Sequence, residues 1–228
     1  MARMNLGVLI SGRGSNLRAL IDACADENFP ARIAVVISNR KDASGLSYAR
    51  EAGIDTLVIE HTDFDSRADF DNALHVGLTD YGVELVCLAG FMRLLDPEFV
   101  SRWHNRMINI HPSLLPSYRG LKTHERALED GVRFTGCTVH YVRPEMDSGP
   151  IIIQAVVPVL ADDTAATLGQ RVLGYEHQIY VEAVRLIASK QIRPSGARVT
   201  GKDLDLPQQG LISPIPVSGL LPDDSSGS

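Results

Sequence analysis

Five short apolar runs recur along the first half of the chain, and stretches with helical periodicity separate them. The predicted strands cover residues 6–10, 33–37, 56–59, 85–89 and 107–110, and the predicted helices cover residues 16–26, 44–52, 66–81 and 97–102. Strands that are apolar on both faces and alternate with helices are typical of a parallel sheet covered on both sides. The pattern therefore predicts a doubly wound α/β fold up to about residue 110.

The second half of the chain departs from this alternation. After a predicted helix at 123–130, apolar runs at 135–142 and 151–158 are joined by a connection too short for a parallel crossover. They predict an antiparallel extension of the sheet. A long helix that covers the sheet is predicted to begin near Thr164, because apolar residues follow at steps of three and four: Leu168, Val172, Tyr175, Ile179, Ala183 and Leu186.

The end of the chain, from about Arg193, is rich in Pro, Gly and Ser and poor in periodic apolar residues. We therefore expect one domain over residues 1–192 and an irregular, partly disordered tail over 193–228, with about the last 20 residues disordered.

Composition excludes several classes of protein. The chain has 22 basic and 28 acidic residues, a net charge of −6, and no basic run of the kind that binds nucleic acid. Three isolated cysteines fit neither a disulfide framework nor a paired zinc motif, and no His-x-x-x-His or Cys-x-x-Cys occurs, so no metal site is predicted. No apolar run reaches the roughly 18 residues of a membrane span. We expect a cytoplasmic protein without nucleic-acid or membrane partners.

A glycine loop follows the first predicted strand directly and leads into the first predicted helix. In Ser-Gly-Arg-Gly-Ser-Asn, residues 11–16, backbone N–H groups and a helix N-terminus converge, which suits a phosphate. A dinucleotide site is disfavoured because the third glycine would fall at Leu17 and because residues 39–41 include no acid for a ribose. A plain turn capped by Ser15 or Asn16, without a ligand, is the remaining alternative.

Asn109 and His111 end the fifth predicted strand, with Ile110 between them. Because successive side chains of a strand face opposite sides, these two point the same way. An amide donor and an imidazole can stabilise the negative oxygen that forms in acyl transfer to an amine. Asp147, in a turn-rich loop, is the carboxylate expected to orient the imidazole. Each residue also has a structural alternative, His111 as a satisfied buried group and Asp147 as an ordinary turn residue.

Four segments together resemble the folate-dependent phosphoribosylglycinamide formyltransferases, over about residues 4–188. They are Leu-Ile-Ser-Gly-Arg-Gly-Ser-Asn-Leu at 9–17, Leu-Ala-Gly-Phe-Met-Arg-Leu-Leu at 88–95, Ile-Asn-Ile-His-Pro-Ser-Leu-Leu-Pro at 108–116 and Met-Asp-Ser-Gly-Pro-Ile at 146–151. The segments occur in the order typical of the family. Arg13 departs from the small or amide residue of some relatives.

The resemblance implies a formyltransferase fold with a Rossmann-like, mostly parallel sheet. It implies transfer of a formyl group from the co-substrate 10-formyltetrahydrofolate to the amine of glycinamide ribonucleotide, without a metal. The implied catalytic residues are Asn109, His111 and Asp147. The implied ribonucleotide site is Gly14, Ser15, Asn16, Leu17, Arg18, Asn109 and Glu176. The implied folate site is Arg67, Met92, Arg93, Leu94, Leu95, Asn109, Arg143, Pro144, Glu145, Met146 and Asp147. Without the resemblance, Glu176 is interpreted as a solvated helix position, and the apolar folate residues could equally be core.

Three other functions share parts of this pattern. A methionyl-tRNA formyltransferase needs a further C-terminal RNA-binding domain, for which the residues after Gln191 are too few and too irregular. A formyltetrahydrofolate hydrolase would use the same trio with water as acceptor, but normally carries an extra N-terminal domain. A non-catalytic nucleotide-binding module would have lost the trio. We therefore expect the transferase, as a monomer or homodimer.

Overall fold

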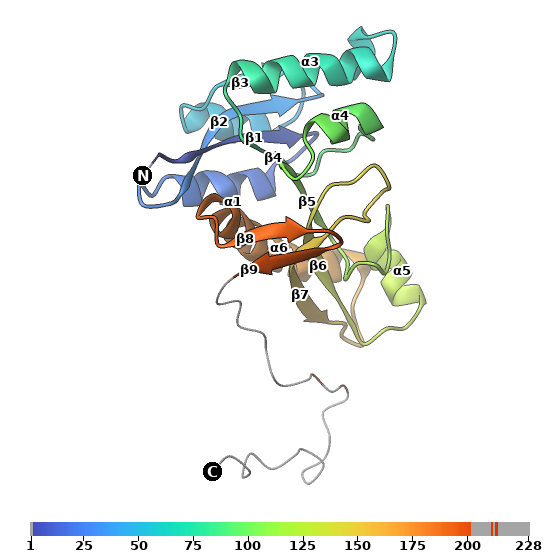
Figure 1. The fold of residues 1–228 in the computed structure, drawn as a ribbon. Helices are drawn as coiled ribbons and strands as arrows, with labels where there is room; N and C mark the ends of the chain where they lie inside the picture. The colour runs from blue at the N-terminus through green and yellow to red at the C-terminus, as the bar shows by residue number, and fades with distance from the viewer. Residues whose placement is uncertain (1, 202–210, 212, 214–228) are drawn as a thin grey trace, which may run out of the picture.

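Seven strands form the central sheet of the computed structural model, which describes residues 2–201, 211 and 213. They are β1 (Met4–Ile10), β2 (Ala31–Ser38), β3 (Thr56–Val58), β4 (Leu85–Leu88), β5 (Met107–His111), β6 (Phe134–Tyr141) and β7 (Ile151–Pro158). Their order across the sheet is β3-β2-β1-β4-β5-β6-β7 (Figure 1). The strands β1 to β5 run parallel, whereas β6 and β7 pair antiparallel. The predicted doubly wound sheet with an antiparallel extension is confirmed.

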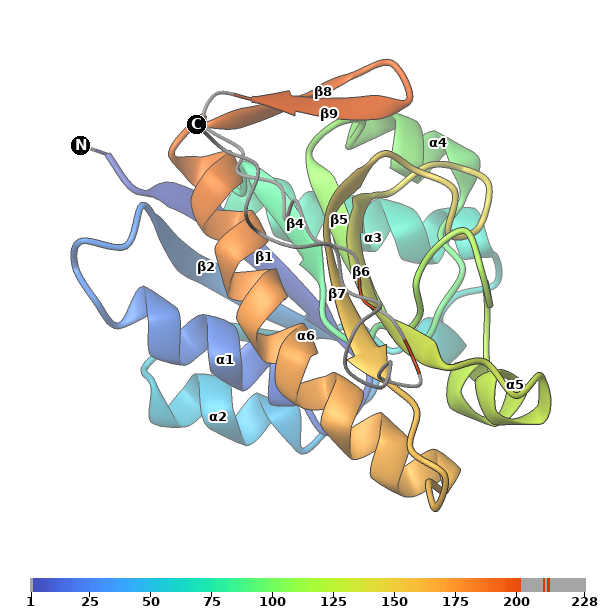
Figure 2. The same cartoon turned by 90° about the horizontal axis from the view of Figure 1, so that it is seen from below.

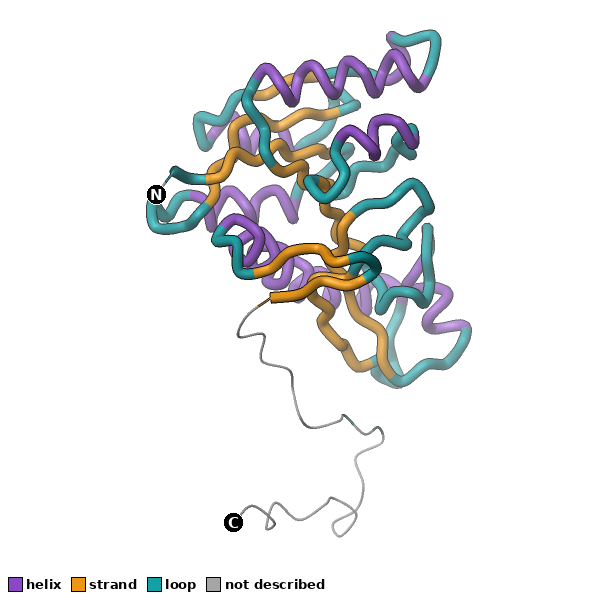
Figure 3. Tube along the Cα trace, viewed as in Figure 1, coloured by secondary structure: helices purple, strands orange, loops and turns teal. Residues whose placement is uncertain are grey.

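Helices cover both faces of this sheet. They are α1 (Ser15–Cys24), α2 (Gly45–Glu51), α3 (Arg67–Asp80), α4 (Pro97–Arg102), α5 (Thr123–Glu129) and α6 (Ala165–Ala188), with a short turn of helix η1 (His61–Asp63). One face carries α1, α2 and α6 over a first core of buried apolar side chains, and the other carries α3 and α4 over a second core (Figure 2). Figure 3 shows the strands running between these two sets of helices.

The strand β1 lies between β2 and β4, so the chain builds the sheet outward from β1 in both directions. The carboxyl ends of the parallel strands β1, β4 and β5 therefore meet at one edge, and the loops that follow them emerge together. Two of these loops are joined directly, because the N–H of Ser11 donates to the carbonyl of Gly90 (3.2 Å). In open α/β sheets this edge, where the strand order reverses, is where ligands bind.

The register of β5 decides which of its side chains face which core. Met107 belongs to the second core, whereas Ile108 and Ile110 belong to the first. Because alternate residues of a strand share a face, Asn109 and His111 lie on the side of α3 and α4. His140 of β6 lies directly opposite Asn109. Three polar side chains therefore share this face of the sheet.

The helix α6 is the long cover helix predicted from residue 164. The Oγ1 of Thr164 accepts from the N–H of Thr167, and the Oγ1 of Thr167 accepts from the N–H of Thr164, so the helix begins with a capping box. The buried stripe differs from the predicted one at mid-helix, because Glu176 and Tyr180 are buried while Tyr175 is 40% exposed. No helix among the described residues combines the length and apolar character needed to cross a membrane.

The chain does not become irregular at residue 193. The strands β8 (Ile192–Ser195) and β9 (Arg198–Gly201) form an antiparallel hairpin, so the predicted tail is wrong for residues 193–201. Its two-residue turn begins with Gly196 at φ 60°, which suits a tight hairpin. Pro194 is tolerated because both strands of a two-stranded ribbon are edges. Apart from residues 211 and 213, the rest of the predicted tail lies outside the described residues.

Alanine at Gly45 is predicted to destabilise the fold, whereas alanine at Gly174 is predicted to stabilise it. A Cβ at Gly45 would lie 2.9 Å from Cδ1 of Ile10 and 3.0 Å from Cα of Gly14, so the β1–α1 loop would have to move. Such overpacking typically costs about 1–3 kcal/mol. A Cβ at Gly174, on the exposed side of α6, meets no atom within 4 Å, and alanine favours a helix over glycine by about 1 kcal/mol. Urea unfolding gives both free energies; changes of the same sign would contradict this packing.

Candidate active site

Four polar side chains form a continuous line of contacts on the face of β5 and β6. The Nδ2 of Asn109 lies 3.3 Å from Nε2 of His140. The same His140 nitrogen is 3.8 Å from Oδ1 of Asp147, and Oδ2 of Asp147 is 3.5 Å from Nδ1 of His111. The structure thus brings together the three residues predicted to be catalytic and adds His140 between them.

Sequence reasoning assigns no role to His140. The residue is 2% exposed, and burial lowers the pKa of its imidazole, which favours the neutral ring. With Nδ1–H donating to the carbonyl of Tyr141 (3.0 Å), Nε2 has the lone pair that accepts from Asn109. This contact points the NH₂ end of the Asn109 amide toward β6. His140 could be found only from the register of β6 against β5, which places it opposite Asn109. The apolar run of one strand does not determine that register.

His111 is held between two acceptors. Its Nε2 lies 2.9 Å from the carbonyl oxygen of Tyr118, and its Nδ1 faces Asp147. Carbonyl and carboxylate oxygens only accept, so both ring nitrogens donate together only when the ring is an imidazolium. The 3.5 Å separation from Asp147 is that of an ion pair rather than a hydrogen bond. The Nδ1–H, whose direction is fixed by the ring, therefore makes no full hydrogen bond to Asp147 and is left for a second acceptor.

Asp147 lies in the loop of residues 142–150, which is yellow in Figure 1 and folds back along β5. The preceding strand β6 ends beside Ile108, yet Asp147 reaches His111 at the other end of β5. Its backbone is left-handed, with φ 50°, a conformation rare outside glycine. Its Oδ2 accepts from the N–H of Gly120 (2.8 Å), which ties this loop to the one after β5. Asp147 is thus held by contacts beyond its own turn.

The glycine loop presents a helix N-terminus without a side-chain cap. Gly14, the residue before α1, has φ 73°, and a Cβ there would lie 2.7 Å from Cα of Gly45. No side chain of the described residues caps α1, so the alternative of a turn capped by Ser15 or Asn16 is wrong. The backbone N–H groups of the first turn are left for an anion or for water.

Asn16 instead uses its side chain to contact α6. Its Nδ2 donates to Oε2 of Glu176 (2.8 Å). Glu176 is 8% exposed, so its interpretation as a solvated position is wrong; burial raises the pKa of the carboxyl, and the bond from Asn16 opposes this. Leu17 is fully buried and offers only its backbone, and the Arg18 guanidinium stacks on Tyr48 of α2, 5.2 Å from the ring centre.

The residues predicted for folate lie mostly on two loops beside the trio, residues 89–96 and 142–150. Met92, Leu94 and Met146 are 68%, 62% and 53% exposed, so these apolar side chains are not core. Leu95 is half-buried and packs against the second core. Exposed apolar side chains beside a polar site are typical of a ligand surface. The other residues predicted for folate are Arg67, which begins α3, and four residues of the two loops: Arg93, Arg143, Pro144 and Glu145.

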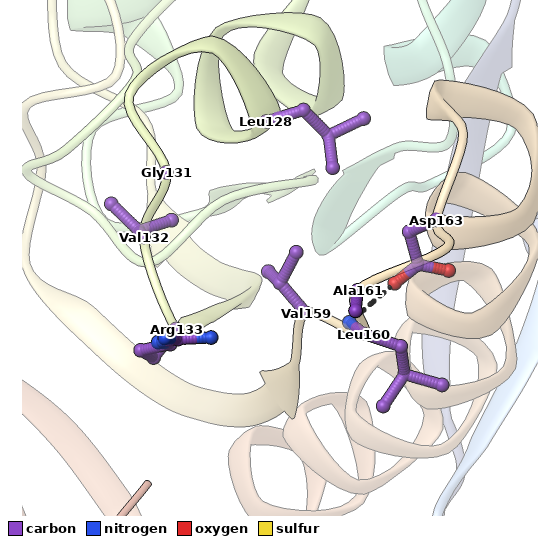
Figure 4. A pocket seen from close by; sticks show the side chains of 8 residues that line it. All are labelled: Leu128, Gly131, Val132, Arg133, Val159, Leu160, Ala161 and Asp163. Atoms are coloured by element: carbon purple, nitrogen blue, oxygen red, sulfur yellow. Dashed lines mark hydrogen bonds between the residues drawn. The ribbon is translucent and has the colours of Figure 1, made fainter. Parts of the chain in front are cut away.

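Two hollows of the surface lie away from these residues. One, of about 300 Å³, lies between the α5–β6 and β7–α6 connections, where Leu128 and Val159 face each other (Figure 4). The other, of about 340 Å³, is lined by residues 39–42 and 60–62 after β2 and β3. Neither includes a residue of the predicted sites. In the described part of the chain, no group of three His, Cys, Asp or Glu side chains is placed to hold a metal ion.

Comparison with known proteins identifies the family. Residues 4–184 match the family described as formyl transferase. The chain belongs to the formyl transferase family. The predicted resemblance is therefore confirmed.

Several members of the formyl transferase family are close relatives. The phosphoribosylglycinamide formyltransferase of Escherichia coli strain K12 is 47% identical over 190 residues, 83% of this chain and 90% of that protein. A crystal structure of glycinamide ribonucleotide transformylase 1 from Symbiobacterium toebii is 50% identical with a TM-score of 0.85, covering 87% of this chain and 94% of that one. The human trifunctional purine biosynthetic protein adenosine-3 is 49% identical over 84% of this chain, which spans only 19% of that protein.

Replacing Glu176 by Gln is predicted to stabilise the protein at neutral pH while weakening the predicted ribonucleotide site. Because the carboxyl pKa is raised in the fold, the stability that its protonated form contributes is lost as pH rises through that pKa; an amide does not titrate. The difference in free energy of unfolding between Glu176→Gln and wild type should grow from pH 5 to pH 8, as urea titrations measure. The KM for ribonucleotide should rise about tenfold, since the neutral amide accepts a weaker hydrogen bond than the carboxylate. A pH-independent difference would contradict the burial argument.

Proposed function

We propose that the chain transfers the formyl group of 10-formyltetrahydrofolate to the amine of N1-(5-phospho-D-ribosyl)glycinamide, in purine synthesis. The observation that carries this proposal is the meeting of Asn109, His111 and Asp147 at the sheet edge from which the uncapped glycine loop also emerges. The name of the Escherichia coli relative supports it. A cytoplasmic location, a metal-free reaction and a monomeric or homodimeric state stay predictions.

The ribonucleotide is proposed to bind by its phosphate to the backbone N–H groups of Gly14, Ser15, Asn16 and Leu17, at the positive end of α1. The carboxylate of Glu176, held by Asn16, accepts from the ribose hydroxyls. The N-terminal half of residues 1–192 then binds the ribonucleotide, and the C-terminal half completes the folate site. The amine extends toward Asn109.

The folate is proposed to lie between the loops 89–96 and 142–150. The exposed side chains of Met92, Leu94 and Met146 supply an apolar surface for a flat pterin, and nearby backbone groups supply hydrogen bonds. The exposed guanidinium groups of Arg67 and Arg93 suit the carboxylates of the glutamate tail. This placement puts the formyl group beside Asp147.

The chemistry requires one bond to form and one to break. The amine attacks the formyl carbon, and the resulting tetrahedral carbon carries a negative oxygen. Asn109 and the imidazolium of His111 donate to this oxygen, while His140 fixes the amide that Asn109 presents. The bond from carbon to N10 of the folate then breaks. The proton lost by the amine ends on N10, and Asp147 orients His111 and assists this transfer.

Asn109→Ala and Asp147→Asn are each predicted to lower kcat at least about a hundredfold. The first removes an oxyanion donor, which typically costs about 2.7–4 kcal/mol of barrier, and the second removes the carboxylate that orients the other donor, His111. Initial rates of formyl transfer measure the effect, and circular dichroism checks the fold. The matched controls are Asn72→Ala and Asp80→Asn, which alter exposed residues of α3 and should keep wild-type rates. A near-normal rate in either folded site variant would overturn the catalytic assignment.

The acceptor is tested by supplying 10-formyltetrahydrofolate with and without the ribonucleotide and following deformylation by absorbance. Transfer predicts a rate that depends on the ribonucleotide and produces one N-formyl ribonucleotide per folate consumed. Equal rates in the absence of ribonucleotide would identify water as the acceptor and the protein as a hydrolase.

A further inference from the structure

A line of hydrogen bonds crosses the carboxyl ends of three neighbouring strands through Ser11. The N–H of Met92, after β4, donates to Oγ of Ser11 (2.8 Å), and that hydroxyl donates to Oδ1 of Asn39, after β2 (2.6 Å). The strands β2, β1 and β4 are neighbours in this order (Figure 1). Ser11 and Asn39 are 7% and 3% exposed, so water competes little for these bonds.

The two bonds point in one direction. Ser11 has a single hydroxyl proton, and it is used in the hydrogen bond to Asn39. An oxygen lone pair is therefore left to accept from the N–H of Met92. Successive bonds of this kind polarise and strengthen one another. Among the described residues the N–H of Met92 has no other acceptor. Loss of the Ser11 hydroxyl would therefore leave a partly buried donor unpaired.

The segment that Ser11 holds is anchored at its other end as well. The Oδ2 of Asp71, a buried residue of α3, accepts from the N–H of Asp96 (2.5 Å). Residues 93–95, between these anchors, belong to the proposed folate site. Ser11 itself precedes Gly14 by three positions in the glycine loop. One hydroxyl thus joins the loops proposed for the two substrates.

We propose that Ser11 is a positioning residue that couples the two substrate loops, so that ribonucleotide on the glycine loop tightens the binding of folate. The inference rests on the proposed function. The Ser11 hydroxyl is occupied by its two bonds, so it acts through the backbone of Met92 rather than on a substrate. When the phosphate orders the glycine loop, the folate loop is ordered with it, and folate then loses less conformational entropy on binding.

Ser11→Ala tests the coupling, with Ser38→Ala as the matched control. Ser38 is a fully buried serine at the same edge, but within the described part of the chain its hydroxyl bonds only to the backbone of residue 40. Titrations of the full chain measure the Kd of tetrahydrofolate with and without saturating ribonucleotide. Wild type and Ser38→Ala should bind about fivefold more tightly with ribonucleotide. Ser11→Ala should show a clearly smaller ratio of the two Kd values, because only the backbone bond from Ser11 N–H to the Gly90 carbonyl still joins the loops, and a KM for the formyl donor raised about tenfold, equivalent to about 1.4 kcal/mol.

An unchanged ratio of Kd values in Ser11→Ala overturns the coupling, as does a ratio of one in wild type. Absence of ribonucleotide-dependent transfer in wild type overturns the proposed function and this inference with it, so the two failures are distinguishable. If Ser11→Ala does not fold, Asn39→Ala is measured in the same way. It frees the Ser11 hydroxyl to turn away from Met92 and should lower the ratio; an unchanged ratio there also overturns the coupling.

Discussion

The pairing of β4 with β1, on the side opposite to β2, is the constraint on which the site depends. It brings the loops after β1, β4 and β5 to one edge of the sheet, although they are widely separated in the chain. Each loop or strand end supplies a different part: a helix N-terminus, an exposed apolar rim, and the polar pair of β5. None of these parts is a site alone. Their meeting follows from strand order, and Ser11 shows that the edge is also cross-linked by side chains.

The antiparallel strand β6 adds a second histidine to the face that carries the first. The two rings have opposite hydrogen-bonding roles, because His140 accepts from Asn109 while His111 lies between two acceptors. Burial favours the neutral ring at His140, whereas the carboxylate of Asp147 is closer to His111. The register of β6 against β5 therefore places beside Asn109 a buried ring that accepts from its amide, on the same face as the ring of His111.

The sequence predicts the sheet well, because strands buried on both faces read as nearly continuous apolar runs. The short connection between the last two runs is likewise enough to predict their antiparallel pairing. His140 escapes prediction because cross-strand contacts depend on a register that shifts by one residue without changing the apolar run. The family resemblance names Glu176, but its burial escapes residue-by-residue reasoning, because hydrophobic periodicity assigns burial to apolar residues and exposure to acids. The hairpin at 192–201 escapes because Pro, Gly and Ser are typical both of disorder and of tight turns.

The hydrogen bond between Asn16 and Glu176 spans 160 positions of the chain. Contacts of such separation form only after the intervening loops have closed. During synthesis the glycine loop is therefore translated long before the residue of α6 that Asn16 contacts. A nascent chain that stops before α6 already contains the Asn109–His111 strand but lacks the carboxylate partner of Asn16. A chain without α6 therefore lacks the contact that fixes the side chain of Asn16, and the start of α1 reaches its final form only when α6 has docked.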